Sequence, residues 1–78
     1  MHDFALRLKD IVAVNKFIKV MRTIDCDMVL QSEDRHYSVD AKSIMGVLSL
    51  NLGGQLRLMA YTNKKEILDQ IKWGLETL

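Results

Sequence analysis

Residues 39–50 read Val39-Asp40-Ala41-Lys42-Ser43-Ile44-Met45-Gly46-Val47-Leu48-Ser49-Leu50, and they are the most informative part of this 78-residue chain. The pattern predicts the end of a strand followed, through Ser43, by a short apolar helix. A serine just before a helix accepts a hydrogen bond from a backbone N–H of the first turn, so Ser43 is a candidate N-cap. The same end of a helix carries partial positive charge, which would favour a phosphate on that hydroxyl. Ser43 is therefore both a candidate cap and a candidate modification site.

Before this stretch the sequence predicts a strand and a helix. Apolar side chains alternate along residues 4–8, with the period of two that indicates a half-buried strand. Asp10 then precedes a run with helical spacing, so we expect it to be the N-cap of a helix. The apolar residues of that run are Ile11, Val14, Phe17, Ile18, Met21 and Ile24.

Three further strands are predicted, at residues 28–31, 35–39 and 55–61. Residues 32–34 are polar and few, as in a hairpin turn between the first two of these strands. The pair Gly53-Gly54 interrupts the chain before the last of them.

A third helix is expected at the end of the chain. Asn63, with Glu66 three residues later, resembles a capping box. The apolar residues that mark the inner face of this helix are Ile67, Leu68, Ile71, Leu75 and Leu78. The order β-α-β-β-α-β-α within one domain, residues 1–78, predicts an α+β open-faced sandwich.

Composition excludes several classes of function. The formal net charge of +1 indicates neither a nucleic-acid partner nor a membrane surface. Cys26 is the single cysteine, so neither a disulfide framework nor a metal site is expected. No membrane-spanning run or signal peptide is recognisable, which favours a cytoplasmic protein. Without a nucleophile–base pair or a phosphate-binding loop, we expect no enzymatic activity and no cofactor.

Residues 39–50 resemble, almost residue for residue, the regulatory-serine segment of HPr, the small phosphocarrier of the bacterial sugar phosphotransferase system. The predicted order of elements is also the HPr order. The resemblance implies a four-stranded antiparallel sheet with three helices on one face. It further implies that Ser43 matches the serine that a dedicated HPr kinase phosphorylates.

The chain departs from the family between the first strand and the first helix. HPr proteins carry phosphate there on a histidine, in a loop of Gly-Ile-His-Ala-Arg-Pro type. Here the connection reads Leu8-Lys9-Asp10-Ile11-Val12-Ala13-Val14, and the two histidines, His2 and His36, lie elsewhere. The resemblance therefore implies a member without phosphohistidine transfer, closest in kind to the catabolite-repression HPr. The alternative is a phosphocarrier with an unconventional acceptor, for which Asp10 would have to form an acyl phosphate.

Apolar side chains beside Ser43 are candidate partner-binding residues. In the family the positions of Ile44, Met45 and Leu48 form an exposed patch that docks other proteins. The alternative is that these side chains pack into the core of a short helix. An HPr kinase-like enzyme and a transcriptional or metabolic regulator are the partners that the resemblance implies.

Basic residues on the first helix are a second candidate surface. Lys16, Lys19 and Arg22 recur every three residues, and such a strip would steer an acidic partner. It would equally serve as the solvated face of an amphipathic helix. A third hypothesis for the whole chain is an HPr fold used only for protein interaction or oligomerisation.

Overall fold

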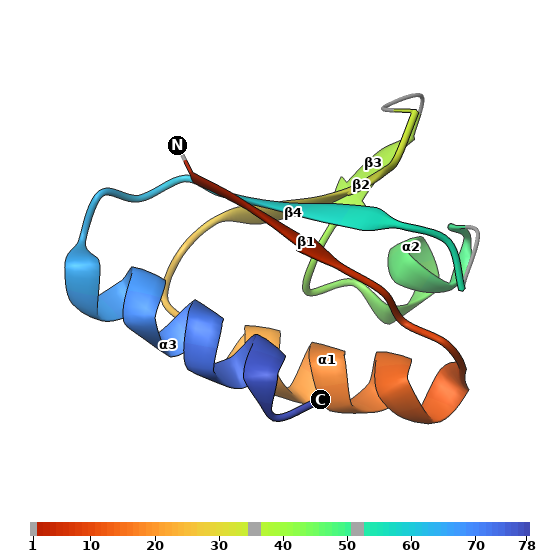
Figure 1. Ribbon diagram of the computed structural model, residues 1–78, viewed down its shortest axis with the longest axis horizontal. Coiled ribbons are helices and arrows are strands. Elements are labelled where there is room, and N and C mark those ends of the chain that lie inside the picture. Colours follow the sequence, from red (N-terminus) through yellow and green to blue (C-terminus); the bar gives the residue numbers. More distant parts are fainter. Residues whose placement is uncertain (1, 35–36, 51–52) are drawn as a thin grey trace.

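The computed structural model describes residues 2–34, 37–50 and 53–78, and it shows an antiparallel sheet with three helices on one face (Figure 1). The strands are β1 (His2–Leu6), β2 (Met28–Ser32), β3 (Ser38–Asp40) and β4 (Leu56–Ala60). The helices are α1 (Ile11–Arg22), α2 (Ile44–Leu48) and α3 (Lys65–Glu76). The strand order is β1-β4-β2-β3, so the last strand of the sequence lies inside the sheet. The predicted α+β open-faced sandwich is confirmed.

The two faces of the sheet differ in chemistry. Leu58 of β4 pairs with Phe4 of β1 and with Leu30 of β2, and its side chain is fully buried in the core. Its neighbour Arg57 lies on the other face, because successive side chains of a strand alternate. There Arg57 Nη1 lies 2.8 Å from Asp3 Oδ2, in a partly exposed ion pair. Such pairs contribute at most about 1 kcal/mol, so the fold rests on the apolar face.

The core fills the space between the sheet and the helices. Its buried members come from the strands, the helices and the connections between them: Leu8, Val14, Phe17, Ile18, Met21, Ile24, Met28, Leu30, Ala41, Val47, Leu50, Leu56, Leu58, Ala60 and Ile71. None of the polar or charged residues in the described part of the chain is buried. Burial of apolar surface is therefore the main stabilising contribution.

Helices α1 and α3 approach closely at one glycine. A side chain at Gly74 of α3 would collide with Cγ1 of Val20 on α1. Gly74 is itself buried, and Figure 1 shows the two helices lying alongside each other beneath the sheet. The missing Cβ thus allows this close contact.

Several predicted boundaries needed correction. The first strand was placed at residues 4–8, whereas β1 ends at Leu6, where its pairing partner Leu56 begins β4. Leu8 is buried in the core although it lies outside the strand. The strand predicted at 35–39 is β3 at Ser38–Asp40, and residues 35 and 36 lie outside the described part.

The predicted capping box of the last helix was wrong. Its N-cap is Lys64, which makes no side-chain capping bond, and Lys64 N donates instead to Thr62 Oγ1 at 3.1 Å. The third helix ends at Glu76, so Leu78 lies beyond its inner face and is exposed. The N-cap predicted for α1 is confirmed, because Asp10 Oδ1 accepts a hydrogen bond from Ala13 N at 2.9 Å.

Candidate functional site around Ser43

Ser43 begins helix α2 as its N-cap, as the sequence predicts. Its backbone is extended, with φ −98° and ψ 111°, and its Oγ accepts a hydrogen bond from Gly46 N at 3.2 Å. Its carbonyl oxygen accepts the first helical bond, from Val47 N at 2.9 Å. Ser43 as a whole is half-buried, and its hydroxyl hydrogen bond is partly buried.

Gly46 is tightly packed in this arrangement, so a larger residue would require its neighbours to shift. A Cβ at this position would lie 3.1 Å from the Val39 Cβ and 3.3 Å from the Ser43 Oγ. The glycine thus makes the close approach of α2 to β3 easier, and its N–H group donates to the serine hydroxyl.

Lys42, the residue before Ser43, is hydrogen-bonded to β3 and to the end of α1. Lys42 Nζ donates to the carbonyl oxygen of Ile24, just after α1, at 2.7 Å. In turn Arg22 Nε donates to the Lys42 carbonyl oxygen at 3.3 Å, and Lys42 N donates to Asp40 Oδ1 at 2.9 Å. These bonds fix the position of Ser43 relative to the end of α1.

The apolar residues of α2 divide between the core and the surface. Val47 is fully buried, whereas Met45 is 81% exposed and Leu48 is 39% exposed. Ile44 is half-buried and packs against the core, so it contributes less to a docking surface than the sequence suggested. Of the three candidate partner-binding residues on α2, Met45 and Leu48 are thus the most exposed.

The three basic residues of α1 are not equivalent. Lys16 and Lys19 are exposed, and within the described residues neither makes a hydrogen bond or an ion pair. Arg22 instead contacts the Ser43 segment through the Lys42 carbonyl. Sequence spacing alone did not separate Arg22 from the two lysines.

Two exposed apolar residues were missed by the sequence analysis. Ile11 and Val12, in the first turn of α1, are each 58% exposed, although Ile11 fits the spacing of the buried stripe. Figure 1 shows this turn at the same end of the molecule as α2. Gly53 N donates to the Leu8 carbonyl oxygen at 3.0 Å, which joins the connection before α1 to the segment after α2.

The connection between β1 and α1 contains no histidine. Its acidic residue, Asp10, uses Oδ1 to cap the helix. His2 lies in β1, and His36 falls outside the described residues. Across the described ranges, no group of three or more His, Cys, Asp or Glu side chains is placed to hold a metal ion. None of the helices there is long and apolar enough to cross a membrane.

Comparison with known proteins identifies the class. The sequence model of the family described as "PTS HPr component phosphorylation site" matches residues 12–72. The chain therefore belongs to the HPr family of the phosphotransferase system. The matched region begins at Val12 in the first turn of α1 and ends at Lys72 within α3, and it leaves out most of the connection that departs from the family pattern. No curated protein matches the chain in sequence.

Solved structures support the same fold. HPr-C-His from Thermoanaerobacter tengcongensis superposes with a TM-score of 0.73 at 19% identity, covering 99% of this chain and 93% of that one. The phosphocarrier protein HPr of Bacillus anthracis gives 0.69 at 16% identity, with 95% of each chain covered. A histidine-containing phosphocarrier protein from Mycoplasma gives 0.69 at 15% identity, covering 97% and 93%. At these identities the likeness shows the fold alone.

Proposed function

We propose that this chain is a regulatory, protein-binding member of the HPr family that does not carry a phosphoryl group on histidine. Its docking surface would be the exposed face of α2, and phosphorylation of Ser43 would control what binds there. The observation that carries the proposal is the contrast between two regions. Residues 39–50 keep a family-like segment with Met45 exposed beside Ser43, whereas the connection from β1 to α1 has no histidine.

The geometry of α2 suits such a role. Met45 lies two residues after Ser43, and a flexible thioether side chain adapts to differently shaped partners. A phosphate on Ser43 would add about 1.5 to 2 negative charges beside this apolar surface. It would therefore change which partners bind without a need for refolding. The partners we propose are an HPr kinase-like enzyme and a transcriptional or metabolic regulator.

A phosphocarrier with an unconventional acceptor is the competing function. It would have to use Asp10, whose carboxylate already stabilises the first turn of α1. No cationic side chain is hydrogen-bonded to Asp10 among the described residues, whereas an acceptor of phosphoryl groups needs positive charge nearby. We therefore favour the regulatory function and a binding role over an enzymatic one.

Intact-protein mass spectrometry after two parallel incubations tests the proposal. One reaction contains phosphoenolpyruvate and enzyme I of the phosphotransferase system, and the other contains ATP and HPr kinase. We expect one added phosphate in the kinase reaction only, mapped to Ser43 and absent from Ser43→Ala. A phosphate gained from enzyme I would overturn the proposal and direct attention to Asp10. No gain in either reaction would leave a family member used only for protein interaction or oligomerisation.

A further inference from the structure

Strand β1 forms one edge of the sheet, because within the described chain it is paired with β4 alone. Proteins commonly protect such an edge by a lysine, a proline or a very short strand. The opposite edge follows this rule, since β3 has only three residues and α2 lies close against it. Strand β1 has five residues, His2–Leu6, and contains neither lysine nor proline. Its outer edge is therefore open to a further strand.

The backbone hydrogen bonds of the sheet fix which groups of β1 face outward. Tyr61, just after β4, donates its N–H to the Asp27 carbonyl oxygen at 3.0 Å and so directs its backbone groups toward β2. Hydrogen-bonded positions alternate along an antiparallel strand, so the odd-numbered residues of β4 bond to β2 and the even-numbered ones to β1. Their partners in β1 are also even-numbered. The N–H and carbonyl groups of Asp3 and Ala5 therefore point away from the sheet.

The apolar side chains of β1 are incompletely covered. Phe4 and Leu6 pack against the core, yet each is only half-buried. Leu58, the partner of Phe4 in the interior strand β4, is fully buried. A strand added beside β1 would cover the exposed part of Phe4 and Leu6, and burial of apolar surface would favour its binding.

The charges on either side of Ala5 are complementary to themselves. Asp3 and Arg7 each lie two residues from Ala5 and so share its face of the sheet, which is turned away from the helices. Arg7 follows β1 directly, and its Nε donates to Gln55 Oε1 at 3.2 Å, beside the start of β4. If two β1 strands pair antiparallel about Ala5, Asp3 of each lies opposite Arg7 of the other, and such pairs stabilise a sheet. Centring the pair on Phe4 would instead place Asp3 opposite Ala5.

From these features we infer that two copies of this chain associate through their β1 edges, in an antiparallel pair centred on Ala5. The two Ala5 residues exchange backbone hydrogen bonds, and Asp3 does the same with Arg7 of the other copy. On the helix-facing side, Phe4 of each copy packs against Leu6 of the other. The two sheets thus join into one, with the helices of both copies on the same face.

Sedimentation equilibrium of the full chain, from micromolar to millimolar concentrations, tests this inference. We expect a monomer–dimer equilibrium within this range. Asp3→Arg places like charges opposite each other at both ends of the paired strands, and Arg7→Asp does so with the opposite sign. Each change should raise the dimer dissociation constant about tenfold or more, because two attractive cross-strand pairs become repulsive.

Complementary variants make the result specific to this register. A mixture of Asp3→Arg with Arg7→Asp restores opposite charges at both contacts, so it should form heterodimers although each variant alone associates weakly. The double variant should likewise regain self-association. Asp69→Arg reverses a charge at an exposed position of α3 and should leave the dissociation constant unchanged. Because Asp3 also pairs with Arg57, thermal unfolding followed by circular dichroism checks that each variant is folded.

Several outcomes would overturn the inference. They are a chain that is monomeric even at millimolar concentration, a dimer that neither charge reversal weakens, and a mixture no more associated than its components. Exchange of β1 strands between copies would also contradict it: Asp3 would then meet Arg57 of the other copy, and Arg7→Asp would have no effect. Phosphorylation of Ser43 and docking on α2 play no part in these measurements, so the outcomes are independent of the proposed function.

Discussion

The ammonium group of Lys42 lies 2.7 Å from the carbonyl oxygen of Ile24, and this bond joins the residue before Ser43 to the chain that leaves α1. Although Lys42 is next to Ser43 in sequence, its charge is thus engaged at another element. Its role in the described structure is to hold the start of α2, and removing it tests that role directly.

Replacing Lys42 by methionine should lower the free energy of unfolding by about 1–3 kcal/mol, because a partly buried charge-assisted hydrogen bond is lost while the chain length is kept. Urea denaturation of the variant measures the change. Lys19→Met removes the same charge from an exposed position and should cost less than about 0.5 kcal/mol. Equal losses in the two variants would show that the Ile24 bond contributes nothing specific.

Ser43→Ala should destabilise the chain by about 0.5–2 kcal/mol, since Gly46 N loses its capping oxygen. Ser49→Ala is the appropriate comparison: its hydroxyl donates back to the Gly46 carbonyl at the end of α2, and its loss should change stability by less than about 0.5 kcal/mol. Thermal unfolding followed by circular dichroism reports both. The cap assignment fails if Ser49→Ala costs more than Ser43→Ala.

Met45→Asp should leave the melting temperature nearly unchanged, because the side chain is 81% exposed, and it should weaken capture of any partner that docks on α2. Val47→Asp, two residues later, buries a carboxylate in the core and should prevent stable folding. Calorimetry combined with a binding assay separates the two effects. A large loss of stability in Met45→Asp would show that the residue belongs to the core after all.

Gly74→Ala should be destabilising by about 1–3 kcal/mol, even though alanine favours helices, because its methyl group would collide with Val20. Shortening Val20 should remove this collision. In a Val20→Ala background, the same Gly74→Ala change should therefore be neutral for stability or stabilising. The coupling free energy of this double-mutant cycle is the measured quantity. If the two changes in the free energy of unfolding are additive, Val20 and Gly74 are not coupled, and the proposed collision between α1 and α3 is wrong.

The sequence predicts the N-terminus of a helix well where the capping hydrogen bond joins residues close together in the chain. Asp10 and Ser43 each offer an oxygen to an N–H three residues later, so both caps were recognisable without knowledge of the fold. The same reasoning failed at Asn63, because Thr62 provides the acceptor for Lys64 N and the helix begins later. A capping pattern thus indicates where a helix can begin, while the packing of the whole chain decides which of these positions is used.

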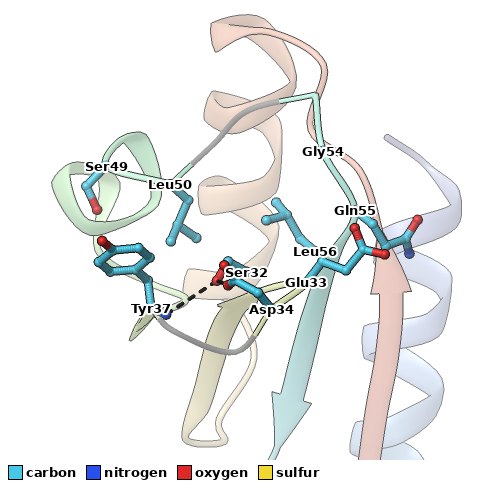
Figure 2. A pocket seen from close by; sticks show the side chains of 9 residues that line it. All are labelled: Ser32, Glu33, Asp34, Tyr37, Ser49, Leu50, Gly54, Gln55 and Leu56. Carbon is cyan, nitrogen blue, oxygen red and sulfur yellow. Dashed lines mark hydrogen bonds between the residues drawn. The ribbon is translucent and has the colours of Figure 1, made fainter.

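Long-range features were not available from local patterns. β1 ends where its partner β4 begins, at the pair Leu6 and Leu56. The alternation of apolar side chains continues to Leu8 and therefore could not predict this end. Likewise Ile11 has the spacing of a buried residue but lies exposed in the first turn of α1. A pocket of about 600 Å³ between the turn after β2, the end of α2 and the start of β4 (Figure 2) is lined by Tyr37, Ser49 and Gln55 from three separate segments, so no single stretch of sequence indicated it.

The position of β4 inside the sheet also bears on how the protein is made. His2 pairs with Ala60 and Leu6 with Leu56, so β1 has no strand to bind until synthesis has passed β4. In a nascent chain that ends before Leu56, the edges of β1 and β2 that β4 pairs with would be left unpaired, and unpaired edges are prone to association. We therefore expect the sheet to assemble late, in one step, once β4 has left the ribosome and can bind β1 and β2 together.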